Sequence, residues 1–111
     1  MGFERIASLD DLWEGEMASF EIGDTEVLLV WPDGGEIRAF QGVCPHQDIP
    51  LAEGKLKGRV IMCRAHQWTF DAESGQGINP GKCQLAEYPV KIENDEIYVN
   101  TEGVVPLFAQ A

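Results

Sequence analysis

The sequence is poor in basic residues. It contains 8 Lys plus Arg against 19 Asp plus Glu, which gives a formal net charge of −11. A chain this acidic repels phosphate backbones and anionic bilayers, so we expect neither nucleic acid nor a membrane as a partner. The surplus of carboxylates is expected to keep the protein in solution, with monomer as the default state. It could also steer the protein toward basic patches on other proteins.

Long hydrophobic runs are missing as well. The longest candidate, residues 27–31, has the length of a strand, far short of a membrane span. The N-terminus has no basic region followed by an apolar stretch, so no signal peptide is predicted. The 3 cysteines cannot all pair, which fits a reducing compartment, and we expect a cytoplasmic protein. A length of 111 residues predicts a single domain, 1–111.

No long amphipathic helix pattern is present, and the chain instead alternates short β segments with turn residues. A capping box at residues 8–11 predicts one short helical turn, and Asn94-Asp95 predicts a hairpin. The class is therefore all-β, with an antiparallel β base. Its strands are expected at 3–6, 17–22, 25–31, 36–42, 88–93 and 96–100. From about 43 to 85, Gly and Pro are frequent, and this loop-rich segment holds every cysteine and histidine.

Two short motifs in this segment carry the chemistry. The first is Cys44-Pro45-His46 and the second is Cys63-Arg64-Ala65-His66. The chain has only 2 histidines, and each lies beside a cysteine at a spacing typical of metal ligands. Isolated cysteines and histidines are usually packing or surface residues, but chance accounts poorly for this grouping.

The pattern suits a Rieske [2Fe–2S] centre, in which one iron takes two thiolates and the other takes two imidazoles. Each loop supplies one ligand to each iron, so we predict Cys44, His46, Cys63 and His66 as the cluster and metal ligands. The competing interpretation is a structural Cys₂His₂ zinc site. Zinc fingers commonly pair cysteine with cysteine and histidine with histidine, whereas each motif here mixes the two. The mixed pairing favours the iron–sulfur centre.

With these motifs in view, the sequence resembles the Rieske ferredoxins of bacterial multicomponent aromatic-ring oxygenases over nearly its whole length. The resemblance is closest to the ferredoxin component of toluene-type four-component monooxygenases. The residues that carry it are Cys44-Pro45-His46-Gln47, Cys63-Arg64-Ala65-His66-Gln67-Trp68-Thr69-Phe70, Gly77-Ile78-Asn79-Pro80 and Cys83-Gln84-Leu85-Ala86-Glu87-Tyr88-Pro89-Val90. It implies a Rieske fold in which a cluster-binding subdomain, about 43–85, is inserted in the β base.

The resemblance also implies partners. Electrons would arrive from an NADH-dependent flavin and iron–sulfur reductase. They would leave to a carboxylate-bridged diiron hydroxylase, and the ferredoxin itself would catalyse nothing. A dioxygenase partner is the alternative, and a structural zinc-binding interaction module is a further one. Catalysis by a mononuclear iron is disfavoured because it needs two histidines of its own.

Supporting residues follow from the same resemblance. Gln47, Trp68 and Pro80 are expected near the cluster, with Pro80 in a third covering loop. Two roles are open for Trp68: it packs beneath its loop, which we favour, or its ring shields the cluster while the indole N–H donates toward a sulfur or a backbone carbonyl. Pro45, Gln47 and Trp68 are candidate contacts for partners at the histidine edge. Cys83 is expected to be a packing residue, because four ligand positions are already filled.

The reduction potential is expected near the low end of the Rieske range, roughly −150 mV. The high-potential respiratory members carry a disulfide between the two cluster loops, and Ile49 and Ala65 occupy those positions here. The hydroxyl donors of those proteins also lack counterparts, and fewer donors stabilise the reduced cluster less well. Protein-film voltammetry measures the value, and a potential above zero contradicts the prediction.

Overall fold

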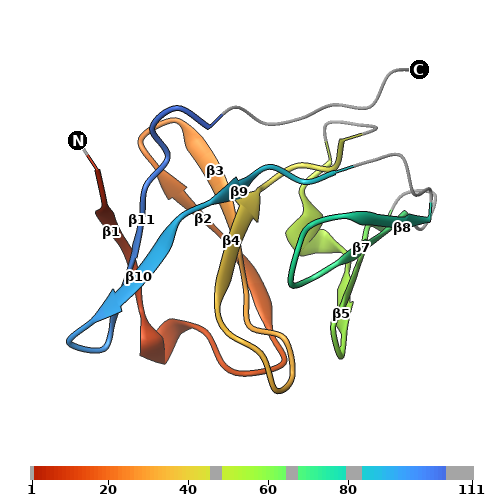
Figure 1. Ribbon diagram of the computed structural model, residues 1–111, viewed down its shortest axis with the longest axis horizontal. Coiled ribbons are helices and arrows are strands. Elements are labelled where there is room, and N and C mark those ends of the chain that lie inside the picture. The colour runs from red at the N-terminus through yellow and green to blue at the C-terminus, as the bar shows by residue number, and fades with distance from the viewer. Residues whose placement is uncertain (1, 46–48, 65–67, 80–83, 105–111) are drawn as a thin grey trace.

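The computed structural model describes residues 2–45, 49–64, 68–79 and 84–104. None of the helices in these ranges is long and apolar enough to cross a membrane. The described elements, shown in Figure 1, are β1 (Glu4–Ser8), η1 (Leu9–Asp11), β2 (Met17–Ile22), β3 (Thr25–Val30), β4 (Arg38–Gln41), η2 (Leu51–Glu53), β5 (Lys55–Lys57), β6 (Val60–Met62), β7 (Thr69–Asp71), β8 (Gly77–Asn79), β9 (Glu87–Tyr88), β10 (Val90–Glu93) and β11 (Glu96–Val99). The two η elements are single 3₁₀ turns.

The strands form three antiparallel sheets. One has the order β1-β11-β10, the second β2-β3-β4-β9 and the third β5-β6-β7-β8. In Figure 1 the second sheet stands between the other two. The all-β class with antiparallel sheets, predicted from the sequence, is therefore confirmed.

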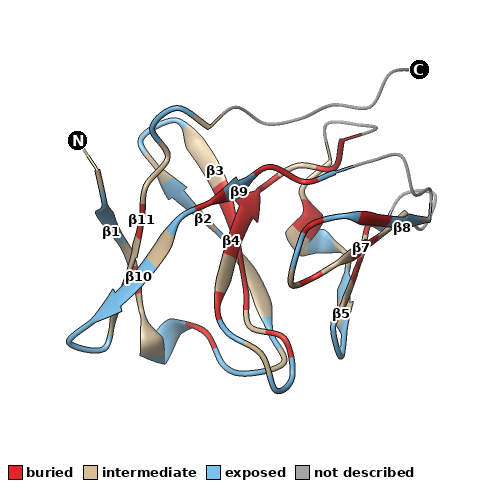
Figure 2. Cartoon of the chain, viewed as in Figure 1, coloured by how far each residue is buried: buried red, intermediate tan, exposed pale blue. Residues whose placement is uncertain are grey.

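The central strand β3 is buried on both faces. Its residues Val27 to Val30 are fully buried, and they alternate between two hydrophobic cores. Val27 and Leu29 join the core shared with the β1-β11-β10 sheet. Leu28 and Val30 join the core shared with the third sheet. An unbroken apolar run of this kind is what burial on both faces requires, and Figure 2 shows the buried residues gathered along this sheet.

In the sequence, the third sheet is inserted between β4 and β9, which are hydrogen-bonded neighbours in the second sheet. The chain leaves β4, forms η2 and β5 to β8, and returns as β9, which pairs with β4 through Ala39–Tyr88 and Phe40–Glu87. Residues 43–85 thus begin and end at the same place on the β base. The prediction of one domain with a cluster-binding insert stays a prediction, and this arrangement accords with it.

Several local predictions match the structure. The strand expected at 17–22 is β2, and Ser8 caps η1 in a capping box with Asp11. The hairpin between β10 and β11 turns at Asn94 and Asp95, which have φ values of 52° and 65°. Positive φ at both central residues is what a two-residue type I′ turn requires.

The single strand expected at 88–93 is wrong. Pro89 divides it into β9 and β10, which belong to different sheets. Proline has no N–H to continue a ladder, and its fixed φ favours a change of direction. The Pro89 carbonyl instead accepts a hydrogen bond from the Asn100 N–H at 3.1 Å. The first strand is also displaced, to Glu4–Ser8, and it is bulged between Arg5 and Ala7.

Candidate iron–sulfur site

Two of the four predicted ligands lie in the described part of the chain. Cys44 follows β4 and Cys63 follows β6, and both are fully buried. Both belong to the same hydrophobic core, together with Leu28 and Phe40 from the central sheet. The fold therefore brings two sulfur atoms from distant points of the sequence into one apolar region.

Each cysteine opens a loop that is closed by an equivalent hydrogen bond. The Cys44 N–H donates to the Ile49 carbonyl at 2.9 Å, and the Cys63 N–H donates to the Trp68 carbonyl at 2.8 Å. In both loops the acceptor comes five residues after the cysteine. The predicted histidines fall between these ends, His46 in the first loop and His66 in the second, although both lie outside the described residues. The histidine ligands therefore stay predictions, supported by the hydrogen bonds that close the two segments in which they lie.

The buried side chain of Gln41 ties the first loop to the returning chain. Its Nε2 donates to the Val43 carbonyl at 2.9 Å, and its Oε1 accepts from the Ala86 N–H at 2.8 Å. The Gln41 N–H also donates to the Ala86 carbonyl at 2.9 Å. A buried amide satisfied in this way orders the backbone on both sides. Gln41 thus fixes the residue next to Cys44, a role that its position in the sequence did not suggest.

The second loop rests on a close backbone approach at Gly54. A Cβ atom at residue 54 would lie 1.9 Å from the Met62 carbonyl oxygen and 3.2 Å from the Arg64 nitrogen. No residue other than glycine fits this position without moving the strand that leads into Cys63. Gly54 was not identified from the sequence, because a glycine beside a short strand usually marks only a turn.

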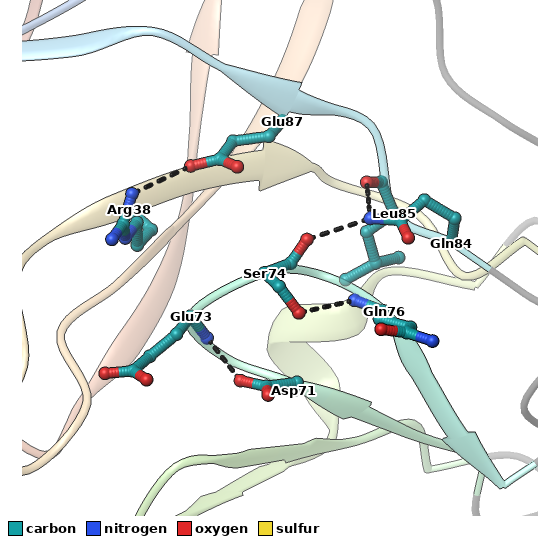
Figure 3. Close-up of polar contacts among 8 residues, drawn as sticks. All are labelled: Arg38, Asp71, Glu73, Ser74, Gln76, Gln84, Leu85 and Glu87. Atoms are coloured by element: carbon teal, nitrogen blue, oxygen red, sulfur yellow. Dashed lines mark hydrogen bonds and ion pairs between the residues drawn. The ribbon is translucent and has the colours of Figure 1, made fainter.

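The third loop predicted from the family resemblance, Asn79-Pro80-Gly81, lies largely outside the description, as do Cys83 and the Asn79 side chain. Its anchors are visible, however. The Gln84 Nε2 donates to the Ser74 carbonyl at 2.8 Å, and the Leu85 N–H donates to the Gly75 carbonyl at 2.8 Å. Figure 3 shows Gln84 and Ser74 joined at this point. The turn after β7 therefore holds the chain where it returns from the third loop.

Of the residues predicted to lie near the cluster or to contact partners, the structure describes Trp68 and Pro45. Trp68 is partly buried and packs against the core that contains both cysteines. Gln47 and Pro80 lie outside the described residues. Pro45, proposed as a contact for partners, is buried and presents little surface to another protein. For that reason we do not retain Pro45 as a contact residue.

Taken together, the structure is an all-β scaffold in which two loops with equivalent hydrogen bonds each bury one cysteine in the same core. The sequence matches the model of the Rieske [2Fe–2S] domain over residues 3–89. The chain belongs to this family, and a [2Fe–2S] cluster is its cofactor.

Individual relatives cover most of the chain. It is 45% identical over 98 residues to the ferredoxin component of the alkene monooxygenase system of Xanthobacter autotrophicus, covering 87% of this chain and 80% of that protein. It is 39% identical over 106 residues to the ferredoxin component of biphenyl 2,3-dioxygenase of Rhodococcus jostii, covering 95% and 98%. Among solved structures, the ferredoxin of carbazole 1,9a-dioxygenase from Nocardioides aromaticivorans superposes with a TM-score of 0.79 at 28% identity, covering 89% and 97%.

The described residues fit the cofactor. Cys44 and Cys63 are soft thiolate donors of the kind that iron–sulfur clusters use, and their burial in one core places them away from water. Each opens a hydrogen-bonded loop that also contains one histidine of the sequence. The two cysteines alone complete neither a zinc site nor a cluster, so His46 and His66 are the donors we expect to supply the remaining bonds.

Replacing Gly54 with Ala is expected to impair cluster assembly. The added methyl would displace the segment from Met62 to Arg64 and lower the free energy of unfolding by about 2 kcal/mol or more. Gly58→Ala is the control, since Gly58 has φ +60° but open space around it, so that only a backbone cost of about 1 kcal/mol applies. Iron per protein after purification decides the matter. Equal iron content in the two variants contradicts the proposed role of Gly54.

Replacing Gln41 with Leu is expected to destabilise the protein by about 2 kcal/mol, because the buried Ala86 N–H and the partly buried Val43 carbonyl lose their hydrogen-bond partner. The cluster should also bleach faster in air, since the residue next to Cys44 is no longer held. Thermal unfolding and the decay of visible absorbance measure the two effects. Gln84→Leu is the matched control, because Gln84 is exposed and its loss should cost less than about 1 kcal/mol. A similar loss in both variants would argue against a special role for Gln41.

Proposed function

We propose that this protein is the Rieske ferredoxin of a multicomponent oxygenase and that it carries single electrons from a reductase to a hydroxylase. The observation that carries the proposal is the pair of equivalent loops, each of which buries one cysteine of the same core beside a motif that contains one histidine. We further propose that Cys44, His46, Cys63 and His66 are the ligands and that the chain has no catalysis of its own.

The relatives support this assignment. The proteins from X. autotrophicus and R. jostii are both ferredoxin components of oxygenase systems, and this chain spans 80% and 98% of their lengths. One of these relatives serves a monooxygenase and the other serves a dioxygenase. The role that both kinds of system share is electron delivery, which depends on the cluster and not on the chemistry at the oxygenase.

The finer assignment concerns the partners. We propose an NADH-dependent flavin and iron–sulfur reductase as the donor, and the diiron hydroxylase of a monooxygenase as the acceptor. The 45% identity to a monooxygenase ferredoxin, against 39% to a dioxygenase ferredoxin, favours this choice over the dioxygenase alternative. The aromatic substrate stays a prediction, since the relative from X. autotrophicus serves an alkene monooxygenase. We place the protein in the cytoplasm, where a reductase finds NADH.

The residues of the chain have distinct tasks in this mechanism. When bound, the cluster supplies one-electron chemistry at a potential set by its mixed ligands. Cys44 and Cys63 would hold it from the buried side, where Leu28 and Phe40 exclude water. The hydrogen bonds from Cys44 to Ile49 and from Cys63 to Trp68 keep the two loops in place during transfer. A rigid site of this kind minimises the rearrangement that accompanies the gain or loss of an electron.

Contact with the hydroxylase is proposed at the loops that contain the histidines. Trp68 ends the second loop, packs against the core and is partly exposed. Partly exposed tryptophans are enriched at protein interfaces. Gln47, within the first loop, is the second candidate. Electrons would leave near these two residues because the imidazole ligands come from the same loops.

Electron paramagnetic resonance, before and after reduction with dithionite, tests the function, with iron and zinc counted on the same sample. The proposal expects an oxidised protein that is silent. The reduced protein should show the low average g value of a histidine-ligated [2Fe–2S] centre. The contrary outcome is a protein that holds zinc and stays silent after reduction, although it was prepared anaerobically with iron supplied. That result would mean that the protein is a structural metal module and not an electron carrier.

A further inference from the structure

The negative charge of this protein is unevenly distributed. Residues 43–85 contain four of the 19 acidic residues but five of the 8 basic ones. The remainder of the chain contains fifteen acidic and three basic residues. The part of the protein that carries the cluster motifs therefore has a formal charge of +1 (5 − 4), while the β base has a charge of −12 (3 − 15), so the β base accounts for all of the net charge of −11.

The cations of this segment are not all compensated. Every arginine in the described part of the chain, and Lys91, forms an ion pair with a carboxylate. Among the described basic residues, only Lys55 and Lys57 have no carboxylate within ion-pair distance. Two uncompensated lysines on so acidic a protein are expected to form its strongest local positive potential.

These two lysines share one face of a sheet edge. They occupy alternate positions of β5, the edge strand of the β5-β6-β7-β8 sheet, and both are exposed. Leu56 between them points the other way and packs against the core. Lys55 pairs in register with Met62 of β6, so its side chain lies beside that methionine on the outer face.

The same residues line a groove next to the cluster site. It has a volume of about 350 Å³, and it is lined by Glu53, Gly54, Lys55, Lys57, Met62, Cys63 and Arg64. Its one carboxylate, Glu53, is already paired with Arg64, whose Nε lies 2.7 Å from Glu53 Oε1. The groove therefore carries net positive charge, and Cys63 places it directly against a proposed ligand of the cluster. Met62 adds a flexible apolar surface that adapts to different contacts.

We propose that this groove docks a carboxylate-bearing surface of the reductase that donates electrons. The inference rests on the proposed function, which requires two partners to reach one cluster. The contact with the acceptor is assigned to Gln47 and Trp68, and Trp68 is not among the described residues that line the groove beside Cys63. The groove is positively charged, whereas the β base is strongly negative. An acidic partner is therefore repelled by the β base and guided to the groove.

Lysines on an edge strand can also serve only to prevent strands from pairing between molecules. Charge reversal separates that role from docking. The variant Lys55→Glu/Lys57→Glu keeps two charges on the edge and still blocks such pairing, but it inverts the potential of the groove. Arg5→Glu/Lys91→Glu is the matched control, since it makes the same change in net charge on β1 and β10, across the central sheet (Figure 1).

The experiment measures second-order rate constants by stopped flow at low ionic strength, with the reductase and the hydroxylase of the oxygenase system as probes. Iron content, resonance spectrum and reduction potential are first matched among the proteins. We expect reduction by the reductase to slow about tenfold in Lys55→Glu/Lys57→Glu, with the difference shrinking as salt is added. We expect transfer to the hydroxylase, and both rates in the control, to stay within about twofold of the wild type.

Carbodiimide coupling gives a readout independent of rate, because it joins lysine amines to carboxylates in contact. Mapping by mass spectrometry should find Lys55 or Lys57 joined to the reductase in the wild-type protein. Unchanged reduction of the variant, an equal loss in the control, or a loss confined to the hydroxylase overturns the docking proposal. A wild-type protein that accepts no electron from the reductase instead refutes the proposed function itself.

Discussion

The architecture depends on one strand that is buried on both of its faces. β3 contributes Val27 and Leu29 to one core and Leu28 and Val30 to the other, and each such side chain stabilises the fold by about 1.5–3 kcal/mol when fully buried. Because the core of Leu28 and Val30 also contains Cys44 and Cys63, the strand that holds the β base together also packs in the core of the two proposed thiolate ligands. Loss of packing in β3 would therefore affect the base and the site at once.

Several elements of this fold could be predicted from the sequence, because local sequence patterns determine them. The period-two strand at 17–22, the capping box at Ser8 and the turn at Asn94-Asp95 each depend on neighbours in the chain. The break at Pro89 was missed because the apolar pattern continues through this residue. It becomes visible only in the structure, where β9 and β10 belong to different sheets. Propensity describes a segment, whereas the choice between two sheets is a property of the whole fold.

The candidate site divides in the same way. The ligand motifs are recognisable because cysteine and histidine at short spacing, repeated twice in one chain, are typical of metal binding, although the structure describes only the cysteines. Gln41 and Gly54 could not be identified as supports, because their roles arise from contacts with Ala86 and Met62, which are distant in sequence. Pro45 was proposed as a contact from the family resemblance, and the structure buries it. Burial depends on how the loop packs, which the sequence alone does not show.

The two loops proposed to hold the cluster carry motifs of unequal spacing. The cysteine-to-histidine spacing is two residues in the first motif and three in the second, yet both loops close five residues after the cysteine. The closing residues, Ile49 and Trp68, both pack against the core that holds the cysteines. Each loop is therefore held by a backbone hydrogen bond and by one apolar side chain in the core. Neither contact involves the histidine. Since these hydrogen bonds fix the loop ends without the histidine, the position of the histidine can differ between the two loops. Each loop can still supply one cysteine and one histidine.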